Sequence, residues 1–175
     1  ILLASSDSNT VANNTVLSNA HGIYLAGSSG NVVANNTVTS NSWDGICLIL
    51  SRSNTVANNT CSSSSIYLDS SCDNTVTNNT MNDCGLFIEG GTLSDWNTHD
   101  IAPSNTVSGK PVYYWKDQNG GTVPVGGGEV ILANCTEVAV EGQDFSRGIC
   151  GVQLGFSNNC TVLNNTVTSD FYGIY

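Results

Sequence analysis

An internal repeat runs through most of the chain and constrains the fold more than any other feature. The phrase Asn-x-Val-x-Asn-Asn-Thr begins at Asn9, Asn31, Asn54 and Asn74, and a related copy begins at Cys160. Neighbouring copies among the first four start about 20–23 residues apart. A fixed period of this length predicts that each copy forms one structural unit that packs on the next.

A second phrase lies between the copies of the first, with Gly22-Ile23-Tyr24-Leu25 as an example. Apolar residues alternate with other residues in both phrases, which predicts short half-buried strands. The L-x-x-L-x-L frame of leucine-rich repeats is absent, and the residues that helical repeats favour are scarce. We therefore predict an all-β solenoid, a parallel β-helix of about eight coils with about 20–23 residues in each.

Equivalent residues of successive coils are expected to stack on one another. Val11, Val33, Val56 and Val76 should form one column of the core. Each Asn-Asn pair predicts a tight turn, because Asn tolerates the left-handed backbone conformation better than most residues. Stacked Asn amides can also hydrogen-bond from coil to coil. The expected structural ladder contains Asn13, Asn35, Asn58, Asn78 and Asn164.

Charge excludes several classes of partner. The chain has 4 Lys and Arg residues against 14 Asp and Glu residues, a formal net charge of -10. Nucleic acid and anionic membrane surfaces are attracted by clustered basic residues, so neither is an expected partner. A polyuronate substrate is disfavoured for the same reason. No apolar run approaches the roughly 20 residues of a membrane span.

The two alternating phrases resemble the repeats of NosD-like proteins, the carbohydrate-binding and sugar-hydrolase type of β-helix found in cell-surface proteins of methanogenic archaea. The segment from Ser108 to Trp115 resembles a Gly-Lys-Pro-(Ile/Val)-Tyr-Tyr segment of the same family. The resemblance implies a right-handed, single-stranded parallel β-helix and an extracellular or cell-surface location. It also implies a periplasmic copper-handling role, although no Met, His and Cys cluster in the sequence supports that role.

The repeat loosens between about residues 90 and 128, within what we predict to be a single β-helix domain spanning residues 1–175. This excursion holds Trp96 and Trp115 and either covers part of the solenoid or contacts a ligand. The middle residue of each second phrase should point outward, and several of these residues are aromatic. The candidate carbohydrate-binding or partner-binding residues are Tyr24, Tyr67, Phe87, Trp96 and Trp115.

The sequence gives little indication of catalysis or metal binding. No pair of carboxylates lies in a catalytic motif, no metal-binding motif is present, and no cofactor is expected beyond weak Ca²⁺ binding at the acidic turn of residues 69–73. Cys135 and Cys160 both lie in Asn-Cys-Thr, so we predict that they stack and form a disulfide, the alternative being two packed thiols. Asn134 and Asn159 are the best candidates among the glycosylation sequons.

Three functions remain open. The first is a non-enzymatic structural or adhesive protein of an extracellular surface layer, sheath or filament, whose partners are further copies of itself or other surface proteins. The two ends of the sequence lie in the same register of the repeat, which predicts either a segment of a longer β-helix or head-to-tail stacking. The second is a module that binds or processes carbohydrate, with neutral glycans as its ligands. The third is copper handling.

Overall fold

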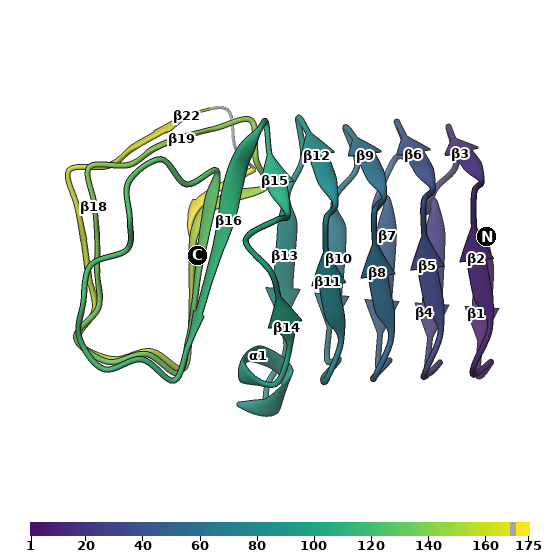
Figure 1. Ribbon diagram of the computed structural model, residues 1–175, viewed down its shortest axis with the longest axis horizontal. Helices are drawn as coiled ribbons and strands as arrows, with labels where there is room; N and C mark the ends of the chain where they lie inside the picture. The colour runs from purple at the N-terminus through teal and green to yellow at the C-terminus, as the bar shows by residue number, and fades with distance from the viewer. Residues whose placement is uncertain (169–170) are drawn as a thin grey trace.

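The computed structural model describes residues 1–168 and 171–175 and confirms the predicted fold class. The chain winds into a parallel β-solenoid of about eight coils, with almost no helix. Five coils are stacked along one axis, and the remaining coils form a second stack (Figure 1). We call these the first and second solenoids, with the boundary between residues 107 and 110.

Three parallel sheets form the walls of the first solenoid, and each coil contributes one strand to each sheet. Sheet one contains β1 (Leu2–Ala4), β4 (Ile23–Ala26), β7 (Ile46–Ile49), β10 (Ile66–Asp69) and β13 (Leu86–Glu89). Sheet two contains β2 (Thr10–Ala12), β5 (Val32–Ala34), β8 (Thr55–Ala57), β11 (Thr75–Thr77) and β14 (Asp100–Ile101). Sheet three begins with β3 (Thr15–Leu17), β6 (Thr37–Thr39), β9 (Thr60–Ser62), β12 (Thr80–Asn82) and β15 (Thr106–Val107).

Like residues stack on like residues, as the repeat predicts. Val11 pairs with Val33, Val33 with Val56, and Val56 with Val76 in neighbouring parallel strands. Ile101 ends this column. The inward residues are buried because the short strands alternate inward and outward side chains and the inward ones face a dry interior.

The asparagine ladder exists, but it lies one residue later than predicted. Asn13, Asn35, Asn58, Asn78 and Asn164 are exposed and have φ between 54° and 60°, so they form the left-handed turns. The second Asn of each pair is the one that points inward and binds its counterpart in the next coil. Asn36 Nδ2, for example, donates to Asn59 Oδ1 at 3.0 Å and to the Val11 carbonyl at 2.9 Å. The side-chain ladder contains Asn14, Asn36, Asn59, Asn79 and Asn105.

The sequence does not distinguish the two asparagines of a pair, although they have different roles. The first forms the left-handed turn, and the second makes the inward hydrogen bonds. The left-handed residue orients its side chain to solvent, and its successor then fills the corner of the coil. A second ladder runs through Asn31, Asn54 and Asn74, and His99 ends it by accepting the Asn74 N–H at Nδ1, 3.2 Å away. These amides satisfy main-chain groups that the buried corners would otherwise leave unpaired.

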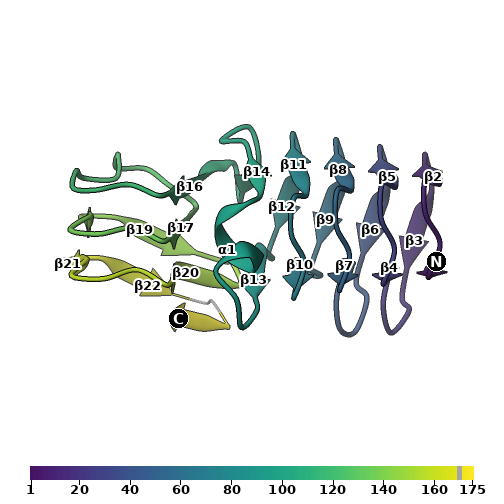
Figure 2. The same cartoon turned by 90° about the horizontal axis from the view of Figure 1, so that it is seen from below.

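A β-hairpin turns the solenoid axis. Strand β15 pairs antiparallel with β16 (Lys110–Lys116), whereas the other strand pairs are parallel. Ser108 and Gly109 connect them with φ of 49° and 81°, the two positive values that a type I′ hairpin turn requires. The coils of the first solenoid are seen edge-on in Figure 1, while those of the second are seen face-on, so the two axes cross steeply. Figure 2 shows the same crossing from below.

The second solenoid continues sheet three through β16 into β17 (Glu129–Ala133), β20 (Cys150–Gly155) and β23 (Tyr172–Ile174). Two smaller pairs complete its walls: β18 (Ala139–Glu141) with β21 (Thr161–Leu163), and β19 (Asp144–Ser146) with β22 (Thr166–Thr168). Its core is centred on Phe145, which is fully buried.

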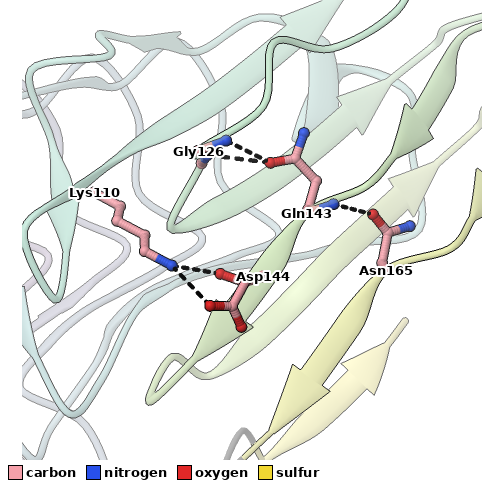
Figure 3. A network of polar contacts seen from close by, with 6 residues as sticks. Lys110, Gly126, Gln143, Asp144 and Asn165 are labelled. Carbon is pink, nitrogen blue, oxygen red and sulfur yellow. Dashed lines mark hydrogen bonds and ion pairs between the residues drawn. The ribbon is translucent and has the colours of Figure 1, made fainter.

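A polar network ties the irregular first coil of the second solenoid to its neighbours (Figure 3). Gln143 Oε1 accepts hydrogen bonds from the Gly126 and Gly127 amides at 3.0 and 3.2 Å, and Asn165 Oδ1 accepts the Gln143 N–H at 2.8 Å. Lys110 Nζ donates to the Asp144 carbonyl at 2.6 Å. Asn165, the second residue of the Asn164-Asn165 pair, therefore continues the coil-to-coil ladder, and Gln143 is its partner in the preceding coil, which has no Asn-Asn pair.

The predicted excursion at residues 90–128 contains the corner between the two solenoids. It begins with the single helical turn α1 (Ser94–Asn97), continues through β14, β15 and β16, and ends before β17. Tyr114 Oη donates to the Trp96 carbonyl at 2.5 Å and Lys116 Nζ donates to the His99 carbonyl at 2.6 Å. These bonds hold the α1 turn against the first strand of the second solenoid.

Candidate functional site

A groove of about 480 Å³ lies in the angle between the two solenoids. On the first solenoid it is bounded by the loops that connect sheet three to sheet one in successive coils. On the second solenoid it is bounded by residues 148–149 and by Phe171 and Tyr172. We call it the elbow groove.

Unequal loop lengths give the elbow groove its depth. The loop between β6 and β7 spans residues 40–45, whereas the loops of the next two coils span only residues 63–65 and 83–85. The longer loop raises Trp43 and Asp44 above the low floor that Ser63, Ser64 and Ser65 form. Figure 2 shows that the loops between β3 and β4 and between β6 and β7 project further than the corresponding loops of the following coils.

Exposed aromatic side chains stand on both sides of the groove. The exposed fraction of Trp43 is 72%, and that of Phe171 is 79%. Between them, Tyr172 stacks on Phe87 with ring centroids 5.3 Å apart, and Phe87 stacks on Tyr67 at 5.9 Å. Phe87 is buried by these contacts. The groove thus has two free aromatic faces above a packed aromatic wall.

The charged side chains that line the groove are carboxylates: Asp44, Asp83 and Glu89. Tyr67 Oη donates a hydrogen bond to Glu89 Oε2. Burial and this bond to a carboxylate both raise the pKa of Tyr67, so its hydroxyl keeps its proton. Arg147 lies beside the groove and pairs with Asp83, with Nη1 and Oδ1 3.3 Å apart.

Asp44, which with Trp43 forms one lip of the groove, is paired with His21. Its Oδ2 lies 3.3 Å from Nδ1 of His21, whose ring contacts Trp43 at a centroid distance of 5.3 Å. Burial raises the pKa of Asp44, and the neighbouring His21 opposes that shift. His21 therefore contacts both Trp43 and Asp44.

Of the five aromatic residues predicted to bind a ligand or partner, some line the elbow groove and others do not. Tyr67 and Phe87 line the elbow groove. Tyr24 lies on the same outer face, in the column that continues through Cys47 to Tyr67, and contacts the ring of His21 at 4.8 Å. The outward aromatic column is therefore partly covered by the second solenoid rather than open along its length.

Trp96 and Trp115 do not line the elbow groove. Only 5% of Trp96 is exposed, and its ring packs so closely on Gly155 that a side chain at residue 155 would overlap it. Trp115 is half-buried against the core of the second solenoid. Trp96 fills the corner between the solenoids, where its ring meets Gly155 of β20, whereas Trp115 packs within the second solenoid.

The predicted disulfide is also absent. Cys135 and Cys160 are both free thiols. Thr136 pairs with Asn158 and Ala139 with Thr161, so Cys160 stacks on Val138 while Cys135 stacks near Ser157. The shared Asn-Cys-Thr sequence is therefore coincidental, because the coil register offsets the two cysteines by three positions.

Asn134 and Asn159 are both exposed in turns with positive φ. Asn134 Nδ2 donates to Asp117 Oδ1 at 2.7 Å, and Asn97 Nδ2 donates to the same atom at 2.9 Å. These two bonds lower the pKa of Asp117. Glycosylation at either sequon stays a prediction.

One comparison assigns the chain to a family. A family model described as "Periplasmic copper-binding protein (NosD)" matches residues 1–102, which is more than half of the sequence. The chain belongs to the NosD family. The matched residues include the strands of the first solenoid as far as β14, while the second solenoid lies beyond them. No curated protein and no solved structure matched the chain.

The family description raises the question of where a NosD-family protein would hold copper. Among residues 1–168 and 171–175, no group of three or more His, Cys, Asp and Glu side chains is placed to hold a metal ion, and this includes the acidic turn considered for Ca²⁺. The side chains near the groove that are most suitable as copper ligands are those with sulfur atoms. Cys84 lies at the groove floor with Sγ 3.5 Å from the Cys61 carbonyl, and Met81 pairs with Cys61 across neighbouring strands.

The described part of this NosD-family chain holds no helix with the length and apolar character to cross a membrane. The family description names the periplasm, an extracytoplasmic compartment.

Several groove residues were not among the candidates predicted from the sequence. Trp43 and Asp44 had a readable signal, because the second coil is longer than the third by an insertion that contains both. Glu89 follows the predicted outward residue Phe87 by two positions and shares its face. Phe171 and Tyr172 had no such signal, because only the change of axis at the hairpin brings them beside coils far away in sequence.

Proposed function

We propose that this NosD-family protein is an extracytoplasmic binding protein whose elbow groove takes a glycan. The observation that carries the proposal is the placement of the freely exposed Trp43 and Phe171 on opposite sides of a groove that also holds carboxylates and hydroxyls. Aromatic faces stack on the apolar faces of sugar rings, while carboxylates and serine hydroxyls accept and donate hydrogen bonds to sugar hydroxyls.

The negative charge of the groove favours glycans that carry no negative charge. The charged residues that line the groove are acidic, so a uronate or sulfated sugar would be repelled. No catalytic step is included, because the proposal rests on a binding surface. Glycan binding would also supply the adhesive role considered from the sequence, while assembly into a layer, sheath or filament stays a prediction.

A glycan array followed by titration calorimetry tests the proposal. We expect saturable binding to at least one uncharged or cationic glycan, weakened roughly tenfold by Trp43→Ala, which corresponds to about 1.4 kcal/mol. Val125→Ala is the matched control, because Val125 is highly exposed on the second solenoid and does not line the groove. Absence of binding to any sugar, or equal affinity for the wild type and Trp43→Ala, would overturn the proposal.

Copper handling is the second candidate, favoured by the family description together with the grouping of Cys61, Met81 and Cys84. Thiolate and thioether sulfur are the donors that Cu(I) prefers. Burial raises the pKa of Cys84 to about 11, so Cu(I) would have to displace the thiol proton.

Competition with a coloured Cu(I) chelator tests this second candidate under anaerobic conditions. If the sulfur group binds Cu(I), the wild type should withdraw one equivalent from the chelator, and Cys84→Ser should lose that capacity. Cys72→Ser is the control, because Cys72 lies outside the groove. Equal uptake by Cys84→Ser and the wild type would exclude this site.

A further inference from the structure

The strongest unassigned chemical feature of the molecule is the charge imbalance inside the elbow groove. Three carboxylates line it, and Arg147, the cation beside it, pairs with Asp83 at 3.3 Å. Asp44 is paired with His21 at the back of the lip. Glu89 has no cationic partner among the described residues, so a negative charge faces the groove uncompensated.

The hydrogen bonding of Glu89 leaves a defined acceptor. Tyr67 Oη donates to Oε2, which fixes the carboxylate against the groove wall. No donor to Oε1 is found in the described part of the chain. An oriented carboxylate oxygen with free lone pairs is a good acceptor for an ammonium group.

The aromatic side chains favour the same ligand chemistry. The face of an aromatic ring carries negative charge and attracts a cation that lies over it. Trp43 is exposed at one lip, and Phe171 and Tyr172 lie at the other. A ligand ammonium between these rings would meet aromatic faces and the carboxylates together.

We propose that the elbow groove selects a saccharide that carries a free, protonated amine, and that Glu89 is its specificity-determining residue. This inference rests on the proposed glycan-binding function and names its substrate class. The sugar rings stack on the lip aromatics, and the ammonium donates to Glu89 Oε1. An acetylated amine cannot make this contact, because it has lost its charge.

Three tetrasaccharides of matched backbone separate this inference from the function on which it rests. They are the β-1,4-linked tetramers that carry an amine, an acetamide or a hydroxyl at C2. At mildly acidic pH we expect the amine form to bind roughly tenfold more tightly than the hydroxyl form, and the difference to shrink at high salt because the contact is partly exposed.

The Glu89→Gln variant should lose this preference while keeping its affinity for the hydroxyl form. Glu141→Gln is the control for net charge, because Glu141 is exposed on the second solenoid away from the groove, and it should retain the preference. Equal binding of all three tetramers, or a preference that survives Glu89→Gln, would overturn the amine inference and leave glycan binding intact. Failure of all three to bind would instead count against the proposed function.

Spermidine serves as a cation without a sugar. If it displaced the amine tetramer at equal concentration, the groove would be a general polyamine site, and the saccharide part of the inference would be overturned. We expect spermidine to compete at least tenfold more weakly, because it cannot stack on Trp43 as a sugar ring does.

Discussion

Gln153 Nε2 donates a hydrogen bond to Glu129 Oε1 at 2.6 Å, and together the two side chains replace a neighbouring strand for β13. Glu129 Oε2 accepts the Leu86 N–H at 3.0 Å, while Gln153 Oε1 accepts the Ile88 N–H at the same distance. Gln153 Nε2 also donates to the Leu86 carbonyl at 2.8 Å. The last strand of sheet one is therefore capped by side chains of the second solenoid, which fixes the angle that forms the elbow groove.

Removing this cap should destabilise the junction strongly. Gln153→Ala removes one hydrogen bond from each of the Ile88 amide, the Leu86 carbonyl and the buried Glu129 carboxylate. We expect a loss of about 3–5 kcal/mol in the free energy of unfolding, measured by urea denaturation. Hydrogen exchange at the Ile88 amide should accelerate selectively.

Gln118→Ala is the control for the cap, because Gln118 is exposed and its side-chain amide donates to the nearby Lys116 carbonyl at 3.3 Å. A loss below about 1 kcal/mol for Gln153→Ala, similar to that of the control, would show that the cap does not hold the junction.

The asparagine ladder predicts that substitutions at the adjacent residues Asn58 and Asn59 affect stability differently. Asn59→Ala should lower the free energy of unfolding by about 2–4 kcal/mol, because it removes the bonds to Val33 and Asn79 and strands the buried Asn36 amide. Asn58→Gly should change stability by less than about 1 kcal/mol, because Asn58 is exposed with φ of 56° and glycine adopts that conformation freely. Thermal or urea unfolding of the two variants checks the contrast, and equal losses would contradict the ladder assignment.

His99 predicts a pH dependence of stability. Its ring is fully buried, its Nδ1 accepts the Asn74 N–H, and burial lowers its pKa from the ordinary value of 6.5. The unfolded chain therefore binds a proton more readily than the folded protein near this value, so stability is complete above pH 6.5 and falls as the pH drops below it. Urea unfolding between neutral and mildly acidic pH should show this decline.

The variant His99→Asn provides the comparison. It keeps an acceptor for Asn74 without a titrating ring, so its stability should depend less on pH across the same interval. An unchanged pH profile in His99→Asn would place the source of the decline elsewhere.

None of the seven cysteines forms a disulfide in the structure, and this is directly measurable. Alkylation of the denatured protein without reductant should modify all seven thiols by mass spectrometry. In the folded protein, Cys72 and Cys160 should react first because they are partly exposed, whereas burial raises the pKa of Cys61 and protects it. A mass that shows five modified thiols would indicate a disulfide and contradict the register that separates Cys135 from Cys160.

The first solenoid could be predicted closely from local spacing. Columns such as Val11, Val33, Val56 and Val76 follow from a repeat in which each coil repeats the same inward positions. The ladder was placed one residue early because spacing identifies the turn but not which of two identical side chains points inward. The candidate site was predicted only in part, through Tyr67 and Phe87, since those two residues belong to the repeat.

What the sequence determined by itself is therefore the solenoid, because a short period of apolar residues specifies local strands that can only be buried by stacking on their neighbours. What the tertiary structure decided is the elbow and everything built on it. Gln153 contacts Ile88 across 65 residues of sequence, and Tyr172 stacks on Phe87 across a still larger separation. Such contacts depend on the direction that the Ser108-Gly109 turn gives to the second solenoid, and a local pattern carries no information about that direction.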